Sequence, residues 1–125
     1  MHAIQFNQLD EKGAFLAIWD DQVGRTDLAA AVVAGREMIE RGVLRGVIID
    51  ASQAGLYDSQ ELAEELWVDG LAALPEGFPI AYVGPPGFRA LREKAIRSAA
   101  VDWGQDVEIF DDRQSAVSWL DTRLS

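Results

Sequence analysis

The chain has 125 residues, of which 49% are hydrophobic, and it contains no cysteine. That length fits a single domain, residues 1–125, whose core is large enough to fold without a metal ion or a disulfide, and the lack of cysteine excludes thiol catalysis. The formal net charge of −10 argues against nucleic acid as a partner, because phosphate backbones are bound by clustered Lys and Arg.

The first third of the chain predicts a β-hairpin followed by a helix. Ala3 to Leu9 alternates partly between polar and apolar residues, and Ala14 to Trp19 is rich in aromatic and branched residues. Thr26 or Asp27 is a suitable N-cap for the helix, and Gly42 is a suitable C-cap. The apolar positions of this helix recur with helical spacing: Leu28, Ala31, Val32, Gly35, Met38 and Ile39.

A hydrophobic strand, Val43 to Asp50, lies at the centre of the chain. Its residues Val47, Ile48 and Ile49 predict burial on both faces, because half-exposed strands alternate polar and apolar residues. We expect the strand to reach the surface at Asp50, whose carboxylate is then a solvated loop acid or a capping group.

A second helix is predicted to begin at Asp58, which forms a capping-box pattern with Glu61, and to end at Pro75. One face of this helix is apolar, and the other carries Glu61, Glu64, Glu65 and Asp69. No basic residue lies between Arg45 and Arg89, so the negative charge of the chain is concentrated in this segment.

Two more strand–helix pairs complete the chain. Phe78 to Val83 and Val107 to Phe110 are short apolar strands. The helix between them is the basic element of the chain, with Arg89, Arg92, Lys94 and Arg97. Its predicted inner positions are Phe88, Leu91, Ala95, Ile96, Ala99 and Trp103. Asp111 or Asp112 can cap the last helix, whose predicted inner positions are Ala116, Val117, Leu120 and Leu124.

Single strands separated by helices imply parallel pairing through crossover connections. We therefore predict an α/β fold: a mixed, mainly parallel sheet of about five strands with an N-terminal antiparallel hairpin and four helices. Ligands of such sheets bind beyond the carboxyl ends of the strands, which places the candidate site between Asp50 and Ser59. The candidate partner- or ligand-binding residues are Asp50, Ser52, Tyr57, Asp58, Ser59, Gln60 and Arg89.

The element order and the run from Ile48 through Tyr57 to Leu62 resemble the STAS domain family, which includes bacterial anti-anti-sigma factors. In that family a hydrophobic strand ends in Asp, and a loop leads to an Asp-Ser-Ser-Gly motif at a helix start. The turn at Phe110 and the segment Trp119-Leu120 are similar to those of the branch called STAS-like or Sec14-like small proteins.

The resemblance implies that a serine at the helix start is phosphorylated by a partner kinase. This chain keeps Asp58 and Ser59, but Gln60 stands at the usual phospho-acceptor position and Glu61 replaces the glycine. Ser59 remains a candidate phosphorylation site, because a dianion at a helix N-terminus is favoured by the free N–H groups. The alternatives are that Asp58 and Ser59 only cap the helix, or that they contact a partner without phosphorylation.

Other chemical roles have weaker support in the sequence. The single histidine, His2, lies at the start of the chain, so a Ser-His-Asp triad is not expected. Pairs of adjacent acidic residues, such as Asp111 and Asp112, lack the ligand spacing of a calcium loop. We expect no metal and no cofactor. The turn Gly84 to Gly87 before Arg89 could hold an anion, but its two prolines remove backbone donors.

We expect a non-catalytic regulatory or protein-interaction module that docks a protein partner through residues 50–65. A carrier of a small apolar or lipid-like ligand is the alternative, and a small enzyme is the third. Without a signal-peptide pattern or an apolar stretch near the roughly 18 to 20 residues that span a bilayer, a cytoplasmic location is expected. The acidic second and basic third helices could pair with each other or with those of another copy, so a homodimer is possible.

Overall fold

The computed structural model describes residues 4–20, 25–53, 74–84 and 87–124. The described strands form one five-stranded sheet in the order β1-β2-β3-β4-β5. They are β1 (Ile4–Gln8), β2 (Ala14–Asp20), β3 (Gly46–Gln53), β4 (Pro79–Val83) and β5 (Asp106–Phe110). β1 pairs with β2 antiparallel, and all other neighbours are parallel. The predicted α/β class, the hairpin and the mainly parallel five-stranded sheet are confirmed.

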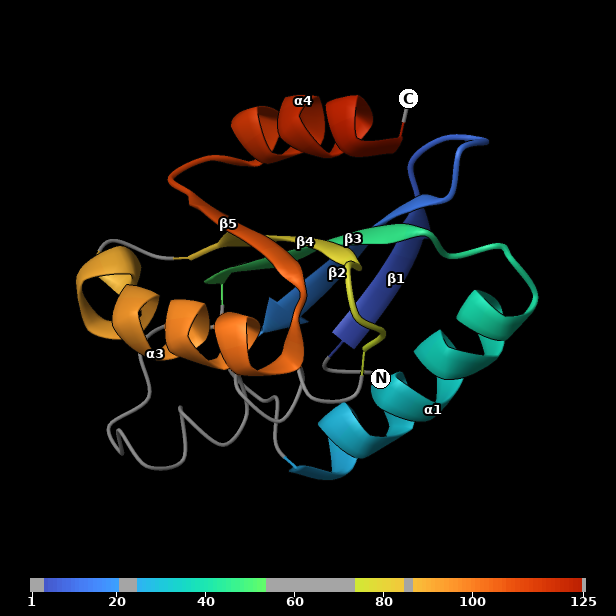
Figure 1. The fold of residues 1–125 in the computed structure, drawn as a ribbon, viewed down its shortest axis with the longest axis horizontal. Coiled ribbons are helices and arrows are strands. Elements are labelled where there is room, and N and C mark those ends of the chain that lie inside the picture. Colours follow the sequence, from blue (N-terminus) through green and yellow to red (C-terminus); the bar gives the residue numbers. More distant parts are fainter. Residues whose placement is uncertain (1–3, 21–24, 54–73, 85–86, 125) are drawn as a thin grey trace.

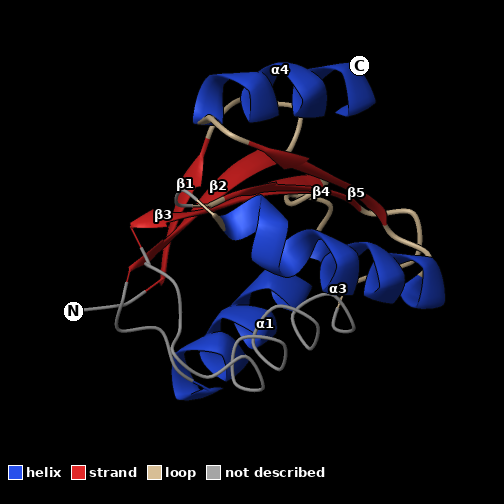
Figure 2. Ribbon diagram, turned by 90° about the vertical axis from the view of Figure 1, so that its left-hand side faces the viewer, coloured by secondary structure: helices blue, strands red, loops and turns tan. Residues whose placement is uncertain are grey.

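In the described part of the chain, three helices flank the sheet: α1 (Arg25–Glu40), α3 (Phe88–Trp103) and α4 (Arg113–Leu124). α1 and α3 lie on one face of the sheet, and α4 lies on the other (Figures 1 and 2). The helix predicted to begin at Asp58 falls outside the described residues, so three of the four predicted helices are observed. No helix in the described part of the chain is long and apolar enough to cross a bilayer.

The sheet separates two apolar clusters, one under each helix layer. Along β3, Val47 and Ile49 belong to the cluster on the α1 and α3 side, and Ile48 belongs to the cluster on the α4 side. Successive residues of a strand point to opposite faces, so a strand covered on both faces is expected to be mostly apolar instead of alternating. The prediction that β3 is buried on both faces is confirmed.

α4 packs closely on the sheet because β3 begins with a glycine. A Cβ atom at Gly46 would lie 2.7 Å from Leu120 Cδ1 and 3.2 Å from Pro79 Cγ. Leu120 is fully buried and belongs to the apolar cluster beneath α4. The missing side chain at Gly46 therefore makes room for the main anchoring residue of α4.

Several predicted details were wrong at element ends. α1 begins at Arg25, so Thr26 and Asp27 lie in its first turn instead of capping it. Trp103 is 51% exposed although helical spacing from Ala99 places it on the inner side. α3 ends at Trp103, so no further turn of the helix covers that ring. Val117, also predicted to point inward, is 37% exposed on α4.

Candidate functional site

Asp50 lies in a row of otherwise apolar side chains that crosses the sheet near the carboxyl ends of its parallel strands. The strand register places Asp50 beside Ile18 of β2 and Val83 of β4, and Val83 beside Phe110 of β5. The three apolar residues belong to or pack against the cluster beneath α4. Asp50 is therefore the polar member of this row of four, on the face that α4 covers.

The expected surface position of Asp50 was wrong, because β3 continues to Gln53 and the residue is only 3% exposed. Ser52 and Gln53 are the exposed residues at the end of the strand. A carboxylate buried in this way must be paired or neutralised, because the loss of its hydration costs several kcal/mol. The structure supplies the partners from two elements.

Both carboxylate oxygens of Asp50 accept hydrogen bonds. Its Oδ2 accepts from Arg113 Nε at 2.8 Å and forms a 2.8 Å ion pair with Arg113 Nη2. Its Oδ1 accepts from the Ser52 backbone N–H at 3.0 Å and from the Ser52 hydroxyl at 2.6 Å. Burial by itself raises the pKa of Asp50, but the Ser52 hydrogen bonds and the Arg113 guanidinium outweigh it and lower that pKa. The carboxylate is thus held ionised.

The start of α4, which carries Arg113, is fixed by its own cap. Asp112 Oδ1 accepts a 2.7 Å hydrogen bond from the Ser115 backbone N–H, and Oδ2 accepts from the Ser115 hydroxyl at 3.0 Å. These hydrogen bonds, the backbone one first, lower the pKa of Asp112. The prediction that Asp111 or Asp112 caps this helix is confirmed for Asp112. The cap and the ion pair together tie the helix start to the end of β3.

Arg113 is the site residue that sequence reasoning missed. A cation in the first turn of a helix is disfavoured by the positive end of the helix dipole. Arg113 is the first residue of α4, directly after Asp111 and Asp112. A basic residue at a dipole-disfavoured position was a signal that it has a specific anionic partner, but the sequence could not show that the partner lies 63 residues away.

The other predicted site residues are not brought together with Asp50 in the described part of the chain. Tyr57, Asp58, Ser59 and Gln60 fall outside the described residues. Arg89 lies in the first turn of α3, and its side chain is also outside what is described. The α3 helix covers the face opposite to α4 (Figure 2). Asp50 and Ser52 therefore remain as the described part of the predicted site, with Arg113 added.

The geometry favours a structural or docking role for this cluster over acid–base chemistry. A general acid needs a carboxyl group that is protonated near neutral pH, and a general base needs one that is free to take a proton. The Asp50 carboxylate has a lowered pKa, and both of its oxygens already accept hydrogen bonds. Among the described residues, no three His, Cys, Asp or Glu side chains are arranged to hold a metal ion.

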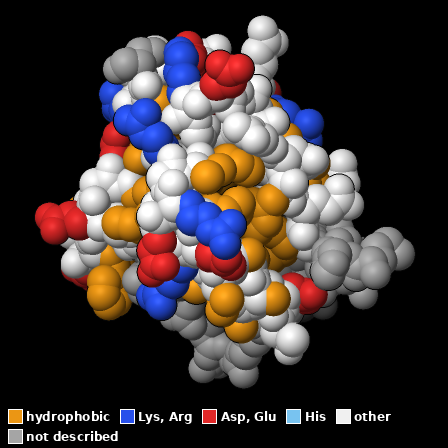
Figure 3. Space-filling view, turned by 90° about the vertical axis from the view of Figure 1, so that its right-hand side faces the viewer, with side chains coloured by type: hydrophobic (Ala, Val, Ile, Leu, Met, Phe, Trp, Pro, Cys, Tyr) orange, Lys and Arg blue, Asp and Glu red, His pale blue; other side chains and the backbone are white. Residues whose placement is uncertain are grey.

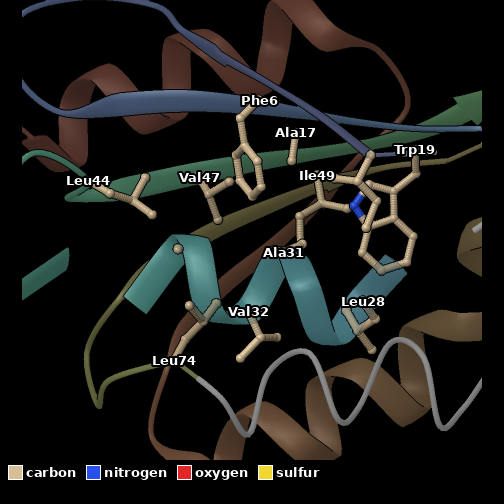
Figure 4. A pocket seen from close by; sticks show the side chains of 12 residues that line it. Phe6, Ala17, Trp19, Leu28, Ala31, Val32, Leu44, Val47, Ile49 and Leu74 are labelled. Atoms are coloured by element: carbon tan, nitrogen blue, oxygen red, sulfur yellow. The ribbon is translucent and has the colours of Figure 1, made fainter. Parts of the chain in front are cut away.

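An apolar cavity lies on the other face of the sheet, between the strands and α1 (Figure 4). Its volume is about 60 Å³. The side chains that line it include Phe6, Trp19, Leu28, Val47 and Leu74. Ligand sites for small molecules usually measure about 300–1,000 Å³. The cavity bounded by these described residues is therefore too small for a lipid-like ligand.

A second surface feature lies at the opposite end of the sheet, at the α1–β3 connection and the start of β4. Figure 3 shows hydrophobic side chains gathered at the centre of this end, with Lys or Arg and Asp or Glu side chains among them. An open hollow of about 550 Å³ is lined there by Leu44, Arg45, Glu76, Phe78 and Pro79, among others. Apolar surface of this kind can also bind a partner, so it is the competing candidate.

Comparison of the chain with family models, curated proteins and solved structures gives no match. The resemblance to the STAS-like family stays a prediction that depends on short motifs, and the central Asp58-Ser59 motif lies outside the described residues. Any function must therefore be argued from the geometry of the site.

Proposed function

We propose that the chain is a non-catalytic protein-interaction module that docks a protein partner at the carboxyl end of its sheet. The described part of this docking face consists of Ser52 and Gln53 at the end of β3 and of Asp112, Gln114 and Ser115 at the start of α4. The last three residues, with Ser118, line an open polar hollow of about 600 Å³. Ser52 and Gln53 belong to the region 50–65 that the sequence predicts as a docking surface, and residues 54–65 lie outside the described residues.

The observation that carries the proposal is the closed hydrogen-bond network around Asp50. It links β3 to the first turn of α4 through Arg113, and it links the carboxylate back to Ser52 on the surface. Groups that are held in place before binding do not have to be ordered by the partner, which lowers the free-energy cost of association. A saturated, ionised carboxylate thus supports a preformed docking face and not a reaction centre.

Site-specific photo-crosslinking distinguishes the two ends of the molecule. A photoreactive amino acid is placed at Gln53, which is exposed on the docking face, and in a matched variant at Val43, which is exposed near the amino end of β3. The two proteins are irradiated in cells of the source organism, and the crosslinked products are identified by mass spectrometry. We expect a defined protein adduct from position 53 and not from position 43.

The captured protein is then purified, and its affinity for the unmodified chain is measured by calorimetry. Gln53→Arg and Gln114→Arg place bulk and charge on the docking face without removing a buried group, and we expect them to weaken binding by about tenfold or more. An adduct from position 43 alone, or unchanged affinity in both variants, would show that the docking face is wrongly assigned.

The alternatives predict different masses for the intact protein. Native mass spectrometry of the chain purified from its own cells would show an added lipid or other apolar molecule if it is a carrier. It would show an added phosphate, which fragmentation can assign to Ser59, if the phosphorylation implied by the STAS-like resemblance takes place. The apolar cavity of about 60 Å³ is smaller than known small-molecule sites, so we expect no lipid bound inside it. A turnover abolished by Asp50→Asn would support the enzyme alternative.

A further inference from the structure

Among the described strands, β1 lies at an edge of the sheet, and alternate residues of it direct their backbone groups away from β2. The Leu9 backbone N–H donates to the Ala14 carbonyl at 2.8 Å, which identifies that pair as hydrogen-bonded across the hairpin. Hydrogen-bonded and non-hydrogen-bonded pairs alternate along an antiparallel ladder. The N–H and C=O groups of Ile4, Phe6 and Gln8 therefore point to the open edge.

The described residues of this edge, Ile4–Gln8, include no charged side chain, no proline and no bulge. Edge strands are normally protected by charged side chains, prolines or bulges. β1 has the sequence Ile-Gln-Phe-Asn-Gln, and its register with β2 runs from Ile4 to Gln8 without a shift. The opposite edge strand, β5, is different. It carries Asp106, which pairs with Arg123, and Glu108, which pairs with Arg97.

Beside the β1 edge lies a groove of about 420 Å³ between this strand and α1. It is lined by Ile4, Gln5, Phe6, Asp27, Ala30, Ala31 and Ala34. Ala30 and Ala34 are exposed, and their small side chains leave space next to the half-buried ring of Phe6. A strand added to β1 would direct every second side chain toward this groove.

We propose that β1 pairs with β1 of a second copy of the chain, antiparallel and about a two-fold axis at Phe6. This register places Phe6 opposite the partner subunit's Phe6 and Ile4 opposite the partner subunit's Gln8. It joins all the outward-facing groups in about six backbone hydrogen bonds. The rings of Phe6 and of the partner subunit's Phe6 then lie on the α1 face, each toward the other subunit's groove.

A second copy fits this edge better than a head-to-tail contact with β5. Pairing of β1 with β5 of another molecule would enclose the Asp106 and Glu108 ion pairs and would leave an open edge at each end of a growing filament. Pairing of β1 with itself closes after two molecules. It also brings uncharged strands together, although each chain carries a net charge of −10. The inference is independent of the docking face proposed above, which lies at the ends of the parallel strands.

The test adds charges at two exposed residues, Gln5 and Asn7, on the face of β1 opposite to Phe6. In the proposed register Gln5 lies opposite the partner subunit's Asn7, and both side chains are exposed. The double change Gln5→Glu with Asn7→Glu therefore sets like charges against each other twice in the dimer. The matched control, Gln5→Lys with Asn7→Glu, sets opposite charges against each other at the same two places.

Analytical ultracentrifugation over a range of concentrations measures the dissociation constant of each protein. We expect the unaltered chain and the control to be dimers. We expect the doubly acidic variant to have a dissociation constant at least about tenfold higher. Circular dichroism checks that each variant is folded. If the acidic variant does not fold, Ala34→Arg replaces it, because arginine is a good helix former and would fill the groove.

The outcomes separate clearly. A monomeric unaltered chain at concentrations of hundreds of micromolar overturns the proposal. A dimer that persists in the folded acidic variant, or in Ala34→Arg, places the interface elsewhere and also overturns it. Loss of the dimer in the acidic variant together with its retention in the control supports the antiparallel register centred on Phe6.

Discussion

At the scale of single residues, the arrangement around Asp50 shows how a buried charge is stabilised by groups from distant parts of the chain. Ser52 is two residues away, whereas Arg113 comes from another element. Hydrogen bonds to a charged group contribute about 1.5–3 kcal/mol, but removal of one partner leaves the other poorly solvated. Arg113 is about half exposed, so water compensates part of such a loss.

The lowered pKa of Asp50 gives its contribution a defined pH dependence. A carboxyl group whose pKa is lower in the folded state stabilises the fold at pH values above its ordinary pKa, and this stabilisation is lost as the pH falls through the lowered value. We expect Asp50→Asn to reduce the free energy of unfolding at pH 7 by about 1–3 kcal/mol. The deficit should shrink on acidification toward pH 3.

Urea denaturation of both proteins at a series of pH values measures this difference, because urea adds no ionic strength. Asp121→Asn is the matched control, since Asp121 forms an exposed ion pair with Lys12 whose loss should change stability much less. A deficit that stays constant between pH 7 and pH 3 would contradict the assignment of the ion pair as its cause.

At the scale of the elements, the position of α4 depends on the start of β3 as well as on the ion pair at its end. Arg113 holds the first turn of α4, and Leu120 packs over Gly46 near the other end of the helix. Leu120 and Ala116 are both fully buried. A polar contact at the first turn and an apolar contact near the other end thus both help to set the orientation of α4.

The close contact at Gly46 predicts opposite effects for two glycine-to-alanine changes. Gly46→Ala should destabilise the fold by about 1–3 kcal/mol, because the new methyl group would overlap Leu120 and Pro79. Gly35→Ala lies inside α1, where the nearest atom to a Cβ, Leu44 Cδ2, is 3.8 Å away. That change should be neutral or stabilising by up to about 1 kcal/mol.

Thermal unfolding followed by circular dichroism compares these two variants with the unaltered chain. Equal effects of the two changes, in either direction, would contradict the close packing of α4 over Gly46.

At the scale of the whole molecule, the net charge of −10 is the dominant property. Surface ion pairs such as Arg97–Glu93 and Arg41–Glu37 offset only a small part of the repulsion among so many carboxylates. Repulsion between distant surface charges is screened by salt, whereas the partly buried Asp50–Arg113 pair is screened less. Salt should therefore stabilise the molecule on balance.

We expect the unfolding temperature to rise when sodium chloride is increased from about 0.01 to about 0.15 M, because the Debye length falls from about 30 to about 8 Å. Calorimetry at a fixed protein concentration measures the change, since association would otherwise contribute. Choline chloride at the same ionic strength is the control. An increase with sodium alone would indicate a bound cation, and no increase would contradict the repulsion argument.

The sequence by itself determined the α/β class, the hairpin and the succession of the described strands and helices along the chain, because these follow from local periodicity and turn residues such as Gly42. It also predicts a site at the end of β3, and this stays a prediction. Only the tertiary structure decided that Asp50 is buried and that Arg113 is its partner, because an ion pair between residues 63 positions apart leaves no periodic signal. The same holds for the open edge of β1, since strand order depends on which segments meet in space.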